Sequence, residues 1–155
     1  MTLTRVSPAE ALRLMNDEGY VYLDVRTPEE FELGHPTSAL NVPWQLVAAS
    51  GERAPNPQFL EVTQRVVRGK KGVVIGCQSG RRSHAAAERL IEAGVVSGEL
   101  SSGAAVHVVD QRAGFGGIRD AFGKLVEAGW QGAGLPISYE PEAGTSYREL
   151  SEAAD

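Results

Sequence analysis

Sulfhydryl groups are nearly absent from this sequence, which has one cysteine among 155 residues. A single cysteine cannot form an internal disulfide, and alone it cannot build a zinc site. We therefore expect a reduced, cytoplasmic setting, with no metal and no other cofactor. Long apolar runs are also missing, and the opening stretch MTLTRVSPAEAL lacks the basic and apolar regions of a secretory signal peptide. We accordingly expect no membrane partner.

Basic residues are outnumbered by acidic ones, 15 to 20, which gives a formal net charge of -5 at pH 7. This balance disfavours non-specific binding to nucleic acid, and we expect no nucleic-acid partner. Any site for an anion must be built locally, against the charge of the whole chain. The apolar fraction of 42% and the chain length are typical of one globular domain with its own core.

Strand and helix signals alternate along the chain. A proline after a capping residue predicts helices that begin at Pro8 and Pro28, and Glu30 completes a capping box with Thr27. Apolar residues at helical spacing predict further helices over residues 57–69, 81–94 and 116–130. Short β-branched runs predict buried strands over residues 20–25, 70–76 and 104–110. The alternation predicts an α/β fold, with a parallel central sheet flanked by helices on both faces.

Two other parts of the chain have the composition of loops that connect helices and strands. Residues 41–57 are rich in proline and are expected to form a surface excursion. The segments 45–57 and 95–103 are candidate partner surfaces or passive loops. We place one domain over residues 1–138 and a polar acidic tail, expected to be partly disordered, over residues 139–155.

The single cysteine, Cys77, follows the strand predicted at residues 70–76 and precedes the helix predicted at 81–94. In parallel α/β folds, ligands bind at the carboxyl ends of the strands. The free N–H groups and dipole of a following helix stabilise an anion, which favours a nucleophilic thiolate at Cys77. Cysteine is also common as a small buried apolar residue. Arg81 and Arg82 favour the functional interpretation, because cations at a helix start are unfavourable unless an anion offsets them.

The loop CQSGRRS and the upstream block LDVRTPEEFELGHPTSALNVP resemble the rhodanese (sulfurtransferase) family. The upstream block departs from the family pattern at Pro36 and Thr37, where Ile-Pro is usual. Downstream, GFGGIRDAFGKLVEAGWQGAGLP resembles the closing block of the family, with extra residues between Gly117 and Gly134. The resemblance extends from about Thr4 to Pro136, and it implies that residues 1–138 form a rhodanese-like domain.

This resemblance implies transfer of sulfane sulfur from thiosulfate or a similar small anionic donor to cyanide or a thiol acceptor. Cys77 would be the nucleophile and would carry the sulfur as a persulfide. A sulfur-accepting protein remains open as a further partner. The residues that the resemblance assigns to binding of the transferred sulfur and its donor are Gln78, Ser79, Gly80, Arg81 and Arg82.

Two alternatives use the same loop. One is a cysteine phosphatase or arsenate reductase, but those loops hold five residues between cysteine and arginine, and only four separate Cys77 from Arg82. The smaller ring suits a sulfur atom better than a tetrahedral phosphate. The other alternative is a sulfur-relay or regulatory module without turnover. Regulatory modules of this family often lack the cysteine, which is present here, whereas a relay protein would use the same residues.

Several residues near these blocks invite catalytic roles for which a structural role is the better interpretation. In proteins that resemble this one, the pair equivalent to Asp24 and Arg26 mainly ties loops together. His35 lies in a Gly-His-Pro sequence that suggests a turn, and we leave it out of the catalytic set. Trp44 and Trp130 are equally well explained by packing and by a place at the pocket rim.

Overall fold

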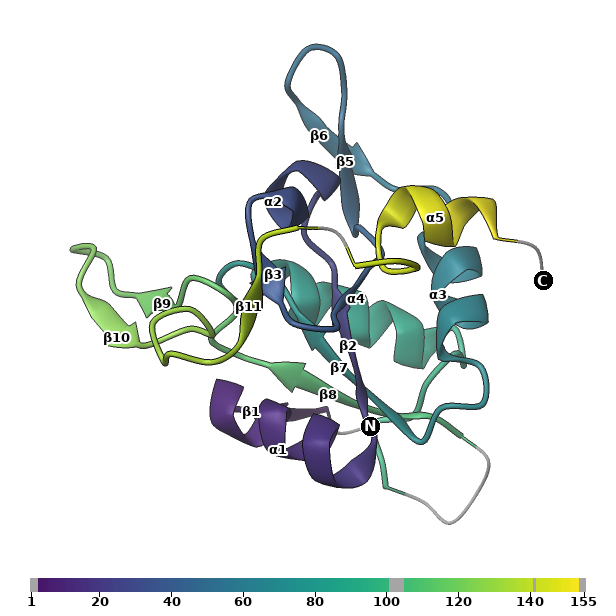
Figure 1. The fold of residues 1–155 in the computed structure, drawn as a ribbon, viewed down its shortest axis with the longest axis horizontal. Helices are drawn as coiled ribbons and strands as arrows, with labels where there is room; N and C mark the ends of the chain where they lie inside the picture. The colour runs from purple at the N-terminus through teal and green to yellow at the C-terminus, as the bar shows by residue number, and fades with distance from the viewer. Residues whose placement is uncertain (1–2, 101–104, 141, 154–155) are drawn as a thin grey trace.

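Five parallel strands form the central sheet of the computed structural model, which describes residues 3–100, 105–140 and 142–153. Every neighbouring pair in this sheet runs parallel, so the expected α/β class and parallel central sheet are confirmed. In spatial order the strands are β1 (Thr4–Val6), β8 (His107–Gln111), β7 (Gly72–Gly76), β2 (Val21–Asp24) and β4 (Leu40–Asn41) (Figure 1).

Both faces of the sheet are covered, as the β-branched strands predicted. Alternate side chains of β7 point to opposite faces, so Val73 and Ile75 join one buried cluster and Val74 joins the other. The helices α3 (Phe59–Val67) and α4 (Arg81–Glu92) contribute to the first cluster, and α1 (Pro8–Glu18) contributes to the second. Because helices cover both faces of the sheet, β7 has no polar face.

The two capping motifs read from the sequence are formed. Ser7 accepts the backbone N–H of Glu10 at 3.1 Å, and α1 follows with proline at its start. Thr27 and Glu30 form a complete capping box at the start of α2 (Pro28–Glu32). Each cap satisfies helix N–H groups that would otherwise have no partner. These contacts span three residues, which is why the sequence alone could predict them.

The proline-rich segment is an antiparallel hairpin rather than an unstructured connection. β5 (Gln45–Val47) pairs with β6 (Arg53–Pro55), and Figure 1 shows this hairpin standing away from the sheet. It is therefore a surface excursion, as expected, but with strands that the sequence analysis did not identify. The segment 95–103 begins against α4, with Ser97 bridged to His107; its last residues, 101–103, lie outside the described part.

The prediction of a helix over residues 116–130 is wrong. The segment forms an antiparallel hairpin of β9 (Ile118–Arg119) and β10 (Leu125–Glu127), which projects from the body in Figure 1. The Asp120 carboxylate accepts the backbone N–H groups of Phe122 and Lys124, which fixes a turn. The spacing of Ile118, Phe122 and Leu125 suggested a helix face, but Phe122 is 96% exposed at the tip of the hairpin.

The described part of the C-terminal segment forms regular structure against the domain, and residues 141, 154 and 155 lie outside it; partial disorder of the tail stays a prediction. β11 (Ile137–Ser138) pairs antiparallel with β3 (His35–Pro36). The helix α5 (Tyr147–Glu152) lies beside α3 in Figure 1, and Tyr147 and Leu150 pack against the core. Because most residues of this short helix are polar, the sequence did not indicate that Tyr147 and Leu150 pack. Among the described residues, no helix has the length and apolarity needed to cross a bilayer.

Candidate active site

Cys77 lies at the carboxyl end of β7, in the loop that leads into α4. This is the edge of the sheet where the sequence analysis placed it. Its side chain is buried, with the residue 2% exposed, and it packs at the end of the larger apolar cluster. Cys77 is a free thiol.

The sulfur of Cys77 is surrounded by hydrogen-bond donors from its own loop. The backbone N–H groups of Gly80 and Ser83 donate to Sγ at 3.1 and 3.3 Å. The thiol lies 3.4 Å from Ser83 Oγ, and that hydroxyl donates to the Gly80 carbonyl at 3.3 Å. Amide donors aimed at one atom stabilise negative charge there. The geometry therefore suits a thiolate more than an inert apolar cysteine.

Glycine is required at position 80 for two separate reasons. Gly80 has φ of +96°, which disfavours any residue with a Cβ atom. A Cβ atom at this position would also lie 2.2 Å from the carbonyl oxygen of Arg112. The tight turn at Gly80 brings its N–H onto the Cys77 sulfur, so the glycine is part of the thiol-binding geometry.

The remaining loop residues have different surroundings. Ser79 and Arg81 are exposed, and Gln78 is half-buried with its Oε1 accepting from Arg26 Nη1 at 3.4 Å. Arg82 donates through both terminal nitrogens to the carboxylate of Glu30, at 2.6 and 3.0 Å. All four were predicted from the sequence to bind the transferred sulfur and its donor. The structure gives Arg82 a carboxylate partner that the analysis had not identified.

Glu30 is held as a carboxylate by this arrangement. Burial opposes its ionisation, but the hydrogen bonds from Arg82 and from the Thr27 backbone outweigh burial and lower the pKa of Glu30 to about 2. Arg53 adds a longer contact at 3.6 Å. Glu30 thus serves the capping box of α2 and also anchors the first turn of α4, two elements that flank the candidate site.

The predicted structural role of Asp24 and Arg26 agrees with their contacts. Arg26 Nη2 donates to Asp24 at 2.7 Å and to the carbonyl of Gly34 at 2.8 Å, and both side chains are buried. Its guanidinium also lies 4.4 Å from the centre of the Phe115 ring. Arg26 therefore joins the segments that follow β2, α2 and β8, next to the cysteine loop.

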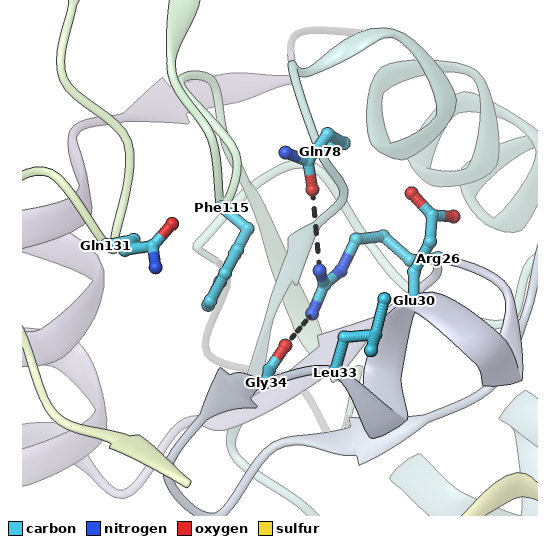
Figure 2. Close-up of a pocket in the computed structure, with 7 residues that line it drawn as sticks. All are labelled: Arg26, Glu30, Leu33, Gly34, Gln78, Phe115 and Gln131. Carbon is cyan, nitrogen blue, oxygen red and sulfur yellow. Dashed lines mark hydrogen bonds between the residues drawn. The ribbon is translucent and has the colours of Figure 1, made fainter. Parts of the chain in front are cut away.

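A cavity of about 480 Å³ opens beside Gln78, with Arg26 and Phe115 on its walls (Figure 2). Among the residues that line it, only Gln78 had been predicted from the sequence as a site residue; the others are Arg26, Glu30, Leu33, Gly34, Phe115 and Gln131. Phe115 follows β8, whose strand also ends at this edge of the sheet, and Gln131 follows β10. The rule that ligands bind at carboxyl ends of parallel strands was the available signal for them.

A second cavity, of about 490 Å³, borders the opposite part of the loop. It is formed by the cysteine loop together with the start of the β9–β10 hairpin. The residues that line it are Gln78, Ser79, Arg81, Gly116, Gly117, Ile118 and Arg119. Because residues 116–130 were predicted as a helix, the contribution of this hairpin to the site was missed.

The other residues considered in the sequence are engaged in packing. His35 is buried, stacks on Phe31 with ring centres 3.7 Å apart, and places Nδ1 2.8 Å from the Phe31 carbonyl oxygen. Trp130 is fully buried and donates to the Pro136 carbonyl, while Trp44 packs edge-on against Phe59. Neither tryptophan lines the two cavities of the site. Within the described residues, no cluster of three histidine, cysteine or acidic side chains could hold a metal.

A sheet of five parallel strands, with a buried cysteine ringed by amides at the end of its central strand, matches a known domain family. The family model for the rhodanese-like domain matches residues 7–111, which is more than half of the chain. The chain belongs to the rhodanese family, and the resemblance read from the sequence is confirmed.

Two curated proteins are similar to this chain in sequence. Rhodanese-like domain-containing protein 15, a chloroplastic protein of Arabidopsis thaliana, is 44% identical over 87 residues, which are 56% of this chain and 47% of that protein. Thiosulfate sulfurtransferase 16, also chloroplastic and from Arabidopsis thaliana, is 47% identical over 76 residues, which are 49% of this chain and 62% of that protein. The chain thus spans about half to two thirds of the length of these curated relatives.

A solved structure extends the comparison to the whole fold. The crystal structure of Rv0390 from M. tuberculosis is similar with a TM-score of 0.63 at 29% identity, covering 90% of this chain and 99% of that one. This coverage is larger than the range 7–111 that the family model matches. The rhodanese fold of the chain is thereby shown over most of its length.

Proposed function

We propose that this protein is a sulfurtransferase that moves sulfane sulfur from thiosulfate, or a similar anionic donor, to cyanide or a thiol through a persulfide on Cys77. One observation carries the proposal: the Cys77 sulfur accepts N–H groups of Gly80 and Ser83 at the carboxyl end of β7. Relatives named thiosulfate sulfurtransferase, 41–47% identical over about half of the chain, support the same activity.

The reaction balances in two displacements. The Cys77 thiolate attacks the outer sulfur of thiosulfate, the S–S bond of the donor breaks, and sulfite leaves with the electron pair. The acceptor then attacks the outer sulfur of the persulfide. The bond between this sulfur and Sγ breaks, and the thiolate of Cys77 is restored. Cyanide becomes thiocyanate, and a thiolate becomes a persulfide, without any external oxidant or reductant.

The loop offers what both displacements require. Sγ must carry negative charge before the first step and after the second one, and the amides of Gly80 and Ser83 stabilise that charge without reorganising. The Ser83 hydroxyl holds the loop by donating to the Gly80 carbonyl at 3.3 Å. The four residues between Cys77 and Arg82 form a ring that suits a sulfur atom, which favours this reaction over phosphate or arsenate chemistry.

The test has two linked measurements on the full chain. An intact-mass spectrum after thiosulfate alone is expected to show a gain of one sulfur atom, and cyanide is then expected to release thiocyanate. Because the chain has one cysteine, the gain reports on Cys77 alone, and Cys77→Ser is expected to show neither result. A mass gain with negligible thiocyanate would instead support a relay protein. The absence of both would contradict the proposal, and aryl phosphate and arsenate would then be assayed.

A further inference from the structure

Asp110 is a buried carboxylate beside the candidate site, with no part in the proposed displacements. It is the penultimate residue of β8 and is fully buried. In the sheet it is paired in register with Ile75 of β7, two residues before Cys77. Alternate residues of a strand share a face, so Asp110 points to the same side as Val108, which belongs to the cluster that α4 helps to form. The carboxylate therefore lies on the α4 side of the sheet.

Arg5 connects this carboxylate to the cysteine loop. Its Nε donates to Asp110 Oδ2 at 2.8 Å, and its Nη2 donates to the carbonyl oxygen of Gly80 at 3.4 Å. Arg5 lies on β1, the edge strand next to β8, directly opposite Asp110 in the register. The N–H of Gly80 is one of the two amides that donate to Cys77 Sγ. A chain of contacts thus leads from Asp110 through Arg5 to the turn that presents one donor to the sulfur.

The residue that supplies the second amide is also close to Asp110. Ser83 donates its backbone N–H to Cys77 Sγ at 3.3 Å. Burial raises the pKa of Asp110, and the nearby Ser83 hydroxyl and Arg5 oppose this effect only in part. The Ser83 hydroxyl itself donates to the Gly80 carbonyl, the same oxygen that Arg5 reaches. Both amide donors to the sulfur therefore belong to residues held in one network with Asp110.

The contacts of Asp110 are poorly suited to a role in stability alone. Within the described part of the chain, its Oδ1 is buried without a partner at hydrogen-bonding geometry. Its ionic partner Arg5 keeps 41% of its side chain exposed, so their attraction is weakened by solvent. A buried carboxylate with one unsatisfied oxygen costs folding free energy that such a partner offsets poorly. The position of this costly group, next to the cysteine loop, indicates a role in the site.

We infer that Arg5 and Asp110 form a positioning pair for sulfur transfer. By holding the turn at Gly80, they keep the two amides of the loop aimed at Cys77 Sγ. Both residues act through the loop rather than on the reacting atoms. The inference rests on the proposed function and adds two residues that lie outside the loop. Donors fixed before the reaction stabilise charge on the sulfur without reorganising, and even a small displacement of such groups slows the chemical step.

Single-turnover loading tests the pair. Full-length protein is mixed with thiosulfate at several concentrations, and the gain of one sulfur atom is followed by intact-mass spectrometry of quenched samples. Arg5→Gln and Asp110→Asn are each expected to lower the maximal loading rate about tenfold. The thiosulfate concentration for half-maximal rate should change by less than about twofold, because donor binding is not affected. Partial unfolding would lower the amount of loaded protein instead of the rate constant.

The double variant Arg5→Gln/Asp110→Asn separates positioning from charge. If Arg5 only neutralised Asp110, Asp110→Asn alone would not slow loading, and removal of both charges would restore the wild-type rate. If the two residues hold the loop as one unit, the double variant is about as slow as either single variant, because each removes the same connection. We expect the second result, and the first would overturn the inference.

Arg13→Gln is the matched control. Arg13 Nε also donates to a carboxylate, that of Glu10, at 2.8 Å, and its side chain is 48% exposed, close to the 41% of Arg5. Arg13 lies on α1, which contributes to the cluster on the other face of the sheet from α4. Its replacement should change neither the maximal loading rate nor the half-saturating concentration of thiosulfate.

Alkylation of Cys77 by iodoacetamide at fixed pH gives a second measurement that does not require sulfur transfer. The thiolate is the nucleophile in this reaction, so both single variants should be alkylated more slowly, by about threefold or more. If wild-type protein gains no sulfur from thiosulfate, the proposed function fails, and alkylation of the variants at the wild-type rate would separately overturn this inference. If wild type and both variants load sulfur at equal rates, the transfer activity stands and the positioning pair is contradicted.

Discussion

The guanidinium of Arg82 donates to both carboxylate oxygens of Glu30, at 2.6 and 3.0 Å, across 52 positions of the chain. The pair joins the first turn of α4, which follows the cysteine loop, to the first turn of α2. Both side chains are largely buried, so the contact is shielded from solvent. It holds the two helix starts that flank the candidate site in a fixed relation.

Glu30→Gln is expected to destabilise the protein by about 1–3 kcal/mol at pH 7, because it leaves the Arg82 guanidinium largely buried without its ionic partner. The free energy of unfolding in urea measures this effect. Glu32→Gln, an exposed position on the same helix, is the matched control and should change stability by less than about 0.5 kcal/mol. Equal stabilities for the two variants would show that the ion pair contributes nothing to the fold.

The same pair predicts a dependence of stability on acid. The pKa of Glu30 is lowered from 4.5 to about 2, so folding favours its ionised form. Its contribution is fully present above the ordinary value and is lost as pH falls from about 4.5 toward 2. We expect the stability difference between wild type and Glu30→Gln to shrink over this window. Urea unfolding at pH 7, 4 and 3 measures it, and a constant difference would contradict the assignment.

Ser83→Ala should slow sulfur transfer with little effect on folding. The substitution removes the hydroxyl 3.4 Å from Sγ but keeps the backbone N–H at 3.3 Å. The hydroxyl also donates to the Gly80 carbonyl, so its loss loosens the loop whose amides bind Sγ, and we expect a decrease of roughly 3–10-fold in the rate of thiocyanate formation. Ser151→Ala on α5 is the control. An unchanged rate in Ser83→Ala would show that the amides alone support the thiolate.

Gly80→Ala should be clearly more destabilising than Gly94→Ala. Both glycines have positive φ, +96° and +76°, and they lie at opposite ends of α4. A Cβ atom at Gly94 meets no atom within 4 Å, whereas one at Gly80 would overlap the Arg112 carbonyl at 2.2 Å. We expect a cost of about 1 kcal/mol at Gly94 and at least about 2 kcal/mol at Gly80, measured by urea unfolding. Equal costs would show that the loop shifts freely.

Phe122→Ser tests the hairpin against the helix that the sequence suggested. Because Phe122 is 96% exposed at the tip of the hairpin, we expect its loss to change the free energy of unfolding by less than about 0.5 kcal/mol. A helix over residues 116–130 would bury this side chain against the sheet, and its removal would then cost about 3 kcal/mol or more. Thermal or urea unfolding distinguishes the two structures.

Local contacts explain which parts of the fold were predictable. The caps at Ser7 and Thr27 depend on residues three positions away, and the placement of Cys77 follows from a strand that leads into a helix. The edge strand β1 has only three residues, two of them exposed, and carries no periodic signal. In the 116–130 segment the apolar residues have helical spacing, but the glycines at 117 and 123 adopt positive φ. That backbone conformation is incompatible with a continuous right-handed helix.

The candidate site was predictable only where it is continuous in sequence. The loop from Cys77 to Arg82 could be read directly, together with the chemistry of its thiol. The partner of Arg82 and the cavity walls at Phe115 and Arg119 come from other segments. Contacts of this kind depend on how the strands are ordered in the sheet, which the pattern of individual segments does not determine.

The 2% exposure of Cys77 also bears on how the protein withstands oxidants. A disulfide between two molecules requires their sulfurs to approach within about 2.05 Å. A thiol enclosed by its own loop cannot reach another protein surface without opening that loop. Covalent dimerisation through Cys77 therefore requires that the loop first open.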